Sequence, residues 1–347
     1  MTSEFVHLHN HSDYSLLDGA QKIDQLVNTI DDLNMDAVAL TEHGNMFSVL
    51  PYYKQAKKAG IKPIIGCEIY VAVGSRFEKK TRSDGGWGNN HLILLAQNFT
   101  GYKNLMKLVT AGYLEGFYYR PRIDMDLLRE YSEGLICMSA CLKGVVPEKM
   151  LKGDYEGARK EALLFSEIFQ DRYYLEIQNH GIPEEEQNLK NMKKLSQDLN
   201  LPLVCTNDAH YAKKEHWEAH DIHICLGTGK ERSDPNRLRY ATPEFYFKTQ
   251  DEMHKLFKEF PGAIENTRKI ADSIDITLPI GESHLPNFPI PKEANTSDPD
   301  EYLKSITESG AQNLYGEITP EIKKRMSHEL NVIKNMGFAG YFLITAD

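Results

Sequence analysis

The sequence predicts an α/β protein built on a seven-stranded barrel and followed by a small helical segment. Short β-rich apolar runs alternate with longer amphipathic stretches, seven such runs occur, and the alternation stops after Asp208. This alternation is typical of a parallel sheet with crossover helices, and seven units favour closure into a barrel. An open doubly wound sheet stays possible, but no GxGxxG motif follows the first strand, so neither a dinucleotide fold nor a nucleotide cofactor has support.

Each predicted strand is a short apolar run, and most of the intervals between runs have helical periodicity. The strands are expected at 5–9, 37–41, 63–71, 91–96, 134–139, 173–178 and 202–206. Helices are expected from residue 208 to about residue 274. This order places the carboxyl ends of successive strands at one mouth of the barrel.

A proline-rich stretch separates this region from the rest of the chain. Residues 278–291 contain four prolines and no periodicity, which is typical of a linker. We expect a barrel with a helical extension at 1–277, a linker at 278–297 and a truncated helical region at 298–347. The chain stops in an apolar run, which predicts a cut inside a longer protein.

The composition is that of an ordinary globular protein, with 41% hydrophobic and 26% charged residues in 347. No apolar run approaches the roughly 18–20 residues of a membrane span, and the first residues lack the features of a signal peptide, so we expect a cytoplasmic protein without a membrane partner. The five cysteines form no CxxC pair, which argues against disulfides. A net charge of -10 argues against wholesale coating of nucleic acid but leaves a local basic groove possible.

The first predicted strand carries His7, His9 and His11 on alternate positions, and therefore on one face. Three protonated imidazoles on one face would repel one another, whereas a metal ion binds them in the neutral form. His9 and His11 are better placed than His7, because active sites of parallel barrels lie at the carboxyl ends of the strands.

Further metal-binding side chains recur at or beside the ends of other strands. They are Asp18, His43, Glu68, His91, Cys141, Asp208 and His210. Each alone has a structural explanation, such as a core histidine, a helix cap or a small core residue. Their joint placement favours a metal site in which carboxylates bridge two or three ions.

Imidazole, carboxylate and one thiolate suit zinc, manganese or iron better than magnesium. Closely spaced ions lower the pKa of a shared water and stabilise the entering and leaving oxygens of a phosphoryl displacement. Phosphoester hydrolysis is therefore the predicted reaction. No GxSxG or GxxxxGK[ST] motif supports a serine hydrolase or a P-loop site, and a thiolate bound to metal leaves little room for cysteine catalysis at Cys141.

Several phrases resemble the PHP (polymerase and histidinol phosphatase) domain. They are His9-Asn10-His11-Ser12, Thr41-Glu42-His43-Gly44, Gly66-Cys67-Glu68, Cys141 and Asn207-Asp208-Ala209-His210. More narrowly, residues 5–19 and 336–344 resemble the N-terminal part of bacterial DNA polymerase III alpha subunits, the C-family replicative polymerases. The resemblance runs through nearly the whole chain.

The resemblance implies a distorted seven-stranded barrel that holds three metals. It also implies a ligand set, which is His9, His11, Asp18, His43, Glu68, His91, Cys141, Asp208 and His210. Some members of the family have lost several of these residues and serve as a platform for a separate proofreading subunit. The complete set here favours a metal-dependent 3′-5′ exonuclease that acts on the 3′ end of a DNA primer, with other replisome subunits as partners. The clustered aspartates that serve polymerisation in the parent enzymes are absent from these residues.

Three side chains are candidates for contacts to nucleic acid. Arg120 and Arg122 follow the aromatic residues 117–119 and offer charge beside a stacking surface. His180, after the sixth strand, could face the site. A solvated loop and a helix cap are the alternative interpretations.

Two other functions stay open from the sequence. A stand-alone phosphatase for small phosphomonoesters would use the same barrel and metals. A catalytically silent scaffold would use the metals only to brace the fold.

Overall fold

The computed structural model describes residues 4–80, 88–282 and 286–347. The chain divides into two compact units, Met1–Leu278 and Pro279–Asp347. Each unit is described by itself. Residues 283–285, within the predicted linker, lie outside the described residues.

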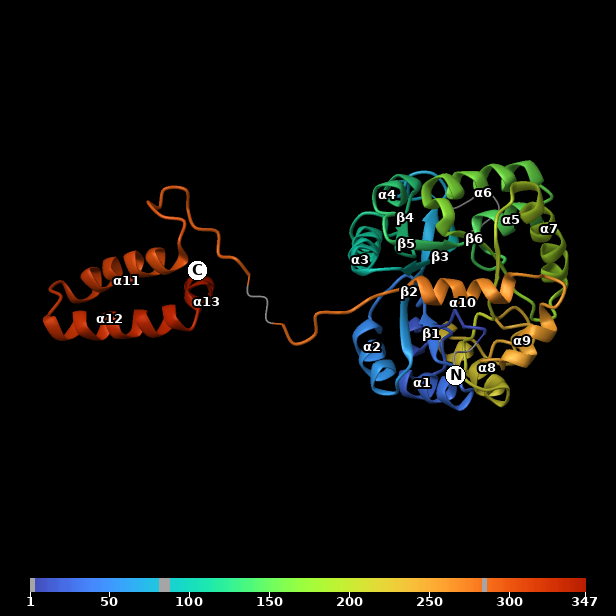
Figure 1. Ribbon diagram of the computed structural model, residues 1–347, viewed down its shortest axis with the longest axis horizontal. Helices are drawn as coiled ribbons and strands as arrows, with labels where there is room; N and C mark the ends of the chain where they lie inside the picture. Colours follow the sequence, from blue (N-terminus) through green and yellow to red (C-terminus); the bar gives the residue numbers. More distant parts are fainter. Residues whose placement is uncertain (1–3, 81–87, 283–285) are drawn as a thin grey trace. The chain divides into compact units, whose positions relative to one another are not determined.

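Unit 1 contains a curled, mixed seven-stranded sheet with helices around it (Figure 1). Its main path runs through β1 (Ala37–Leu40), β2 (Lys62–Ala72), β3 (Asn89–Ala96), β5 (Leu135–Met138), β6 (Tyr173–Ile177) and β7 (Leu203–Cys205). A short strand that the sequence did not predict, β4 (Arg122–Ile123), pairs with β2. The predicted α/β class is confirmed.

The expectation of a wholly parallel sheet is wrong at one strand. β3 pairs antiparallel with both β2 and β5, while the other ladders are parallel. β2 and β3 follow each other without a helix in the described part of their connection, so the chain returns as a hairpin does instead of crossing over. The amino end of β3 therefore lies beside the carboxyl ends of the other strands.

The predicted first strand is a segment held by isolated bridges instead of a continuous ladder. His7 bridges Val38 of β1, and Asn10 bridges Ala209, just after β7. The backbone N–H groups of Ala39 and His11 donate to the carbonyls of His7 and Ala209, at 2.8 and 2.9 Å. Because this segment has a different neighbour on each side, it links the two outer strands of the sheet and brings its own histidines between them.

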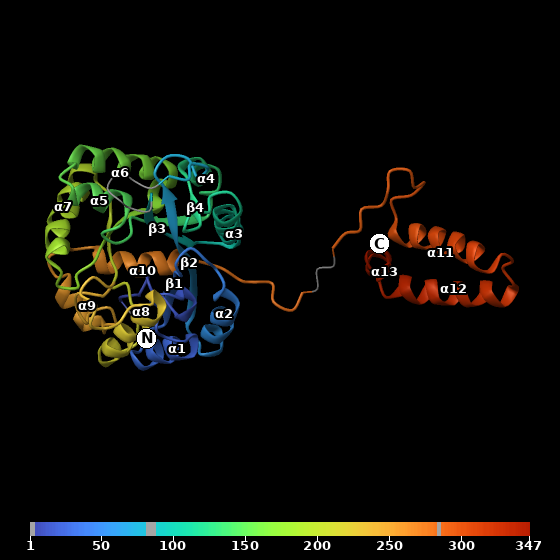
Figure 2. The ribbon, with the colours of Figure 1, turned by 180° about the vertical axis from the view of Figure 1, so that it is seen from behind.

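Among the residues of unit 1 that the structure describes, ten α-helices are assigned. They surround the sheet (Figure 2). They are α1 (Ile23–Asp32), α2 (Val49–Lys58), α3 (Phe99–Leu114), α4 (Met125–Glu130), α5 (Val145–Leu151), α6 (Tyr155–Phe169), α7 (Pro183–Leu199), α8 (Trp217–Thr228), α9 (Gln250–Leu256) and α10 (Ala263–Ser273). The apolar faces of all of these except α8 join one large core, and Trp217 of α8 packs against a smaller cluster of Tyr211, Phe245 and Tyr246. In α1, for example, Leu26 and Ile30 are four residues apart and both fully buried.

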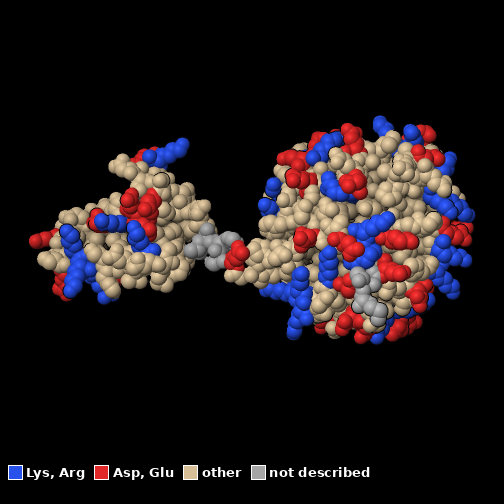
Figure 3. Space-filling model, in the orientation of Figure 1, with Lys and Arg blue, Asp and Glu red and all other residues tan. Residues whose placement is uncertain are grey.

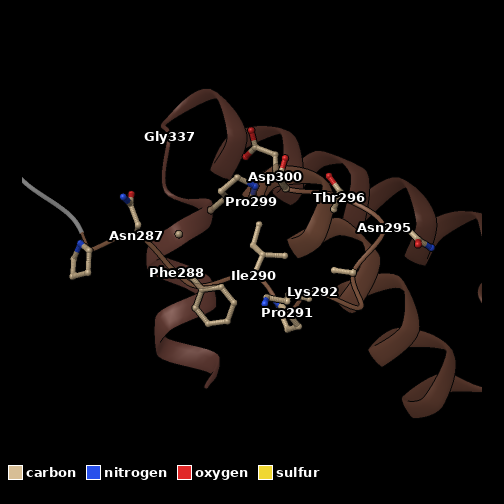
Figure 4. A pocket seen from close by; sticks show the side chains of 15 residues that line it. Asn287, Phe288, Ile290, Pro291, Lys292, Asn295, Thr296, Pro299, Asp300 and Gly337 are labelled. Atoms are coloured by element: carbon tan, nitrogen blue, oxygen red, sulfur yellow. The ribbon is translucent and has the colours of Figure 1, made fainter.

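Unit 2 contains α11 (Pro299–Tyr315), α12 (Pro320–Asn335) and α13 (Ala339–Ala346). A small core of Leu303, Ala339 and Leu343 holds it together. Phe288 stacks on Tyr302 with ring centroids 6.1 Å apart, so part of the predicted linker packs on these helices. Figure 4 shows the pocket that this segment forms with the start of α11 and with Gly337.

Positive and negative side chains are mixed on the face of unit 1 shown in Figure 3. Within the described ranges, no helix is both long enough and apolar enough to cross a membrane.

Candidate metal centre

The nine candidate ligands come from seven places along the chain, and the structure brings them together. They are His9 and His11 from the N-terminal segment, Asp18 from the following loop, His43 after β1, Glu68 within β2, His91 in β3, Cys141 after β5, and Asp208 and His210 after β7. Three groups have ligand atoms within 4.8 Å of one another, namely His11–His43–His210, His9–His11–Asp208 and Glu68–His91–Cys141. Reversal of β3 is what allows His91, near the start of its strand, to join residues at the ends of others.

Glu68 connects these groups because its two carboxylate oxygens face different histidines. Oε2 lies 3.0 Å from Nε2 of His9, and Oε1 lies 2.8 Å from Nδ1 of both His43 and His91. Burial favours the neutral acid, but the charges of His91 and His43 outweigh it and hold the pKa of Glu68 well below its usual range. A buried carboxylate with this geometry can bridge two cations.

Asp18 joins the same assembly from the other side. Its Oδ1 lies 3.1 Å from Nε2 of His43, and its Oδ2 lies 4.0 Å from Nε2 of His210. Burial opposes ionisation here too, but the His43 charge lowers the pKa of Asp18 far below its ordinary value. Asp18 is therefore a carboxylate ligand candidate between two imidazoles.

The hydrogen bonds of three histidines fit metal binding through Nε2. Nδ1 of His9 lies 2.7 Å from Glu176 Oε1, and Nδ1 of His11 lies 3.0 Å from Ser15 Oγ. Nδ1 of His210 lies 2.8 Å from the backbone carbonyl of Asp208. A proton on Nδ1 leaves the Nε2 lone pair available to an ion.

Unsatisfied atoms in the centre give a second test of the fit. Nε2 of His11 and Oδ1 of Asp18 and of Asp208 are buried without a hydrogen-bond partner. The His11 and Asp208 atoms nevertheless lie only 3.1 Å apart, and Asp208 Oδ1 is 3.2 Å from His9 Nε2. Metal–ligand bonds of 2.0–2.1 Å at a tetrahedral ion separate the ligand atoms by roughly 3.3 Å. The donor set and its spacing therefore fit divalent ions.

Sequence reasoning missed residues that orient these ligands. Glu176, inside β6, contacts His9 and also accepts the Ala140 N–H at 3.0 Å. A carboxylate inside an otherwise apolar strand was a signal that could have found it. The Tyr240 hydroxyl donates to Oδ2 of the candidate ligand Asp18 at 3.3 Å and lies 2.8 Å from Nε2 of His210, but Tyr240 is in an irregular segment 30 residues after His210. Nothing in the local sequence marks Tyr240.

We expect Glu176→Gln to weaken metal binding by about 10–100-fold, because the amide keeps only one acceptor oxygen for the two N–H groups of His9 and Ala140, so that the orientation of His9 is less well fixed. In a calorimetric titration of the metal-free protein with manganese or zinc, the Kd of the variant should be higher than that of the unmodified chain. The surface variant Glu167→Gln on α6 is the matched control. An unchanged titration would show that Glu176 does not position His9.

His7 and His180 lie outside the centre. His7 is fully buried with Nε2 2.9 Å from the Lys248 carbonyl, and burial lowers its pKa to about 4. His180 contacts Glu185 Oε1 at 2.6 Å and the Asn207 carbonyl at 2.9 Å through its two ring nitrogens. Because His180 is also 1% exposed, the prediction that it contacts nucleic acid is wrong for this fold.

The two arginines that the sequence grouped together have different environments. Arg122 is 1% exposed and donates to the backbone carbonyls of Gly116, Arg76 and Glu78 at 3.0–3.3 Å. The prediction that Arg122 contacts nucleic acid is therefore wrong, since its donors are used inside the protein. Arg120 is partly exposed, with its guanidinium 5.7 Å from the ring of Tyr70.

We expect Arg122→Met to lower the free energy of unfolding by roughly 2–4 kcal/mol, because buried carbonyls lose their donors. Arg120→Met should change it by less than about 0.5 kcal/mol. Urea denaturation of both variants measures the difference. Equal effects would contradict the structural role of Arg122.

Comparisons with known proteins agree with this geometry. Residues 7–180 match the model of the PHP domain, and residues 301–347 match that of the bacterial DNA polymerase III alpha NTPase domain. The DNA polymerase III subunit alpha of Borreliella burgdorferi is 50% identical over 99% of this chain, and that of Treponema pallidum is 45% identical over 99%. The chain spans 30% and 29% of the length of these two relatives.

Among solved structures, histidinol phosphate phosphatase from Lactococcus lactis, complexed with zinc, L-histidinol and phosphate, covers 66% of this chain and 95% of its own at 14% identity. With a TM-score of 0.29, that likeness is too weak to support a functional argument. The match of the family model to half of the residues is sufficient without it. The chain belongs to the PHP domain family, and it is similar along nearly all of its length to the alpha subunits of bacterial DNA polymerase III.

Proposed function

We propose that unit 1 hydrolyses phosphodiesters with two or three divalent ions and removes nucleotides from the 3′ end of DNA as a proofreading 3′-5′ exonuclease. The observation that carries the proposal is the convergence of nine buried or half-buried ligand side chains, Glu68 among them. Zinc, manganese or iron suits a set of imidazoles, carboxylates and one thiol. The similarity to alpha subunits supports DNA as the substrate and a place beside a polymerase and other replisome subunits.

Hydrolysis breaks the bond between phosphorus and the 3′ oxygen of the penultimate nucleotide. Water supplies the new oxygen on phosphorus, and the 3′ oxygen leaves with a proton, so the products are a nucleoside 5′-monophosphate and a shortened strand. Bound divalent ions would supply a nucleophilic water near neutral pH and neutralise charge on the phosphate. The protein holds the ligands in place and keeps their Nε2 atoms unprotonated through the partners of Nδ1.

Arg120 is the cation in this proposal that binds the phosphate. Its guanidinium lies over Tyr70, whose ring is edge-on to His91 with centroids 5.3 Å apart. Since the Tyr70 ring lies next to both Arg120 and His91, the partly exposed guanidinium is available to donate to the phosphate oxygens of an entering strand.

The test is incubation of the purified chain with manganese or zinc and a 5′-labelled oligonucleotide that has a free 3′ hydroxyl. We expect a ladder shortened one nucleotide at a time, and no ladder from the same strand with a 3′-terminal phosphorothioate linkage. Absence of products with each of zinc, manganese and iron would overturn the proposal. Rapid hydrolysis of histidinol phosphate without attack on DNA would indicate a small-molecule phosphatase instead.

A further inference from the structure

An exposed row of aromatic rings lies beside the candidate metal centre. Phe47, Tyr113 and Phe117 are 60%, 38% and 48% exposed, although large apolar side chains are usually buried. The ring centroids of Phe47 and Tyr113 are 6.2 Å apart, and those of Tyr113 and Phe117 are also 6.2 Å apart, the latter pair stacked at 28°. The three rings therefore form one continuous surface, here called the aromatic row.

The aromatic row is assembled from separate parts of the chain. Phe47 precedes α2, Tyr113 lies in the last turn of α3, and Phe117 lies in the segment that leads to β4. In both ribbon views α2 and α3 flank the same side of unit 1 (Figures 1 and 2). Packing between these elements, and not local sequence, brings the rings together.

The aromatic row is linked to the metal centre through the short segment between His43 and Phe47. Phe47 follows the candidate ligand His43 by four residues, and Gly44 lies in the turn between them with φ 64°. A Cβ at Gly44 would lie 2.8 Å from Pro121 and 2.9 Å from Tyr70, so this turn has no space for a side chain there. The turn at Gly44 therefore packs closely against Pro121, which follows Arg120, and against Tyr70, whose ring lies beside His91.

We propose that the aromatic row is a stacking platform for an unpaired, single-stranded 3′ end, whose terminal phosphodiester reaches the metal centre past Arg120. Exposed aromatic faces beside a cation are the means by which proteins bind single strands without reading their sequence. A paired terminus cannot stack in this way, because its bases already stack within the duplex. The proposal rests on the proposed function and names its substrate as a frayed or mismatched end.

The aromatic row could instead be an apolar docking face for another protein. Three features favour a nucleic-acid strand, namely the rings themselves, the partly exposed Arg120 and continuity with ligands suited to phosphate chemistry. The test separates the two occupants.

The variants are Phe47→Ala, Tyr113→Ala, Phe117→Ala and the triple combination. Phe99→Ala is the matched control, because Phe99 is 39% exposed at the opposite end of α3. Anisotropy of a labelled 12-nucleotide thymidine strand gives the affinity, and KM and kcat for 3′ release are measured in parallel. Because base–aromatic stacking contributes ~1–3 kcal/mol, each variant should weaken binding by about 5–150-fold and raise KM more than it lowers kcat.

A small ester separates failure of this proposal from failure of the proposed function. Hydrolysis of the p-nitrophenyl ester of thymidine 5′-monophosphate should be unchanged in all variants, because it does not reach the aromatic row. Blunt duplex DNA should bind more weakly than a duplex with an unpaired 3′ extension. Unchanged strand affinity in the triple variant, with the ester still hydrolysed, would overturn the platform and leave docking of a protein as the role of the aromatic row. If the unmodified chain does not hydrolyse this ester, the proposed function itself is refuted.

Discussion

Asp208→Asn should reduce release of 3′ nucleotides by at least about 100-fold, beyond the 10–100-fold that follows loss of an outer-shell partner. The carboxylate lies 3.2 Å from His9 and 3.1 Å from His11, and the substitution removes its charge without changing its size. Asp208 has φ 45°, a left-handed conformation that asparagine also tolerates, so the backbone should not be strained. The expected loss therefore reports on ligation and not on folding.

Elemental analysis and a melting curve complete the test of Asp208→Asn. The variant should bind fewer ions per chain than the unmodified protein. Asp126→Asn is the control, because Asp126 is 87% exposed on α4 and should leave rate and metal content unchanged. If the domain were a scaffold without catalysis, the unmodified protein would have no activity to lose, and the only effect of the substitution would be a lower melting temperature. Full activity and full metal content in Asp208→Asn would contradict the assignment of this ligand.

Glu68→Gln should remove activity at least as completely and should remove more metal. One Glu68 oxygen faces His9, and the other faces His43 and His91. The amide of glutamine has one acceptor oxygen in place of two, and its NH2 group would face a histidine instead of a metal ion. An ion bound by either carboxylate oxygen would therefore bind less well. Asp208→Asn should leave the Glu68–His91–Cys141 group able to bind, whereas Glu68→Gln should disable that group and weaken the other two, because Glu68 also contacts His9 and His43.

Metal stoichiometry after equilibration with manganese or zinc distinguishes the two variants. The surface change Glu167→Gln should retain the content of the unmodified protein. If Glu68→Gln lost no more metal than Asp208→Asn, Glu68 would not connect the sites in the way its geometry indicates.

The candidate ligands could be predicted from sequence because strand ends of a barrel converge, so a side chain at a strand end has a known neighbourhood even when its partners are far away in sequence. His91 shows the limit of this reasoning. It lies near the start of its strand, and a wholly parallel barrel would have placed it at the opposite rim. The structure resolves that conflict by reversing β3, which local periodicity cannot reveal because both directions have the same alternation.

The contacts around the centre were less accessible from sequence. Arg120 and Arg122 are two residues apart and chemically identical, but one is partly exposed and the other is buried on backbone carbonyls. Their difference depends on β4, a two-residue strand too short to produce a pattern. Tyr240 and the aromatic row depend on packing between distant segments, for which a single sequence has no signal.

The bridges made by the N-terminal segment bear on biosynthesis. The backbone N–H of Val6 donates to Thr267 Oγ1, a partner 261 positions later in the chain, and Asn10 pairs with Ala209. During translation the candidate ligands His9 and His11 leave the ribosome before the rest of unit 1, but their segment lacks these partners until the last helix of unit 1 has been made. Nascent chains arrested before that helix should therefore expose these imidazoles to any free transition metal, and correct loading can follow only once the whole of unit 1 has been made.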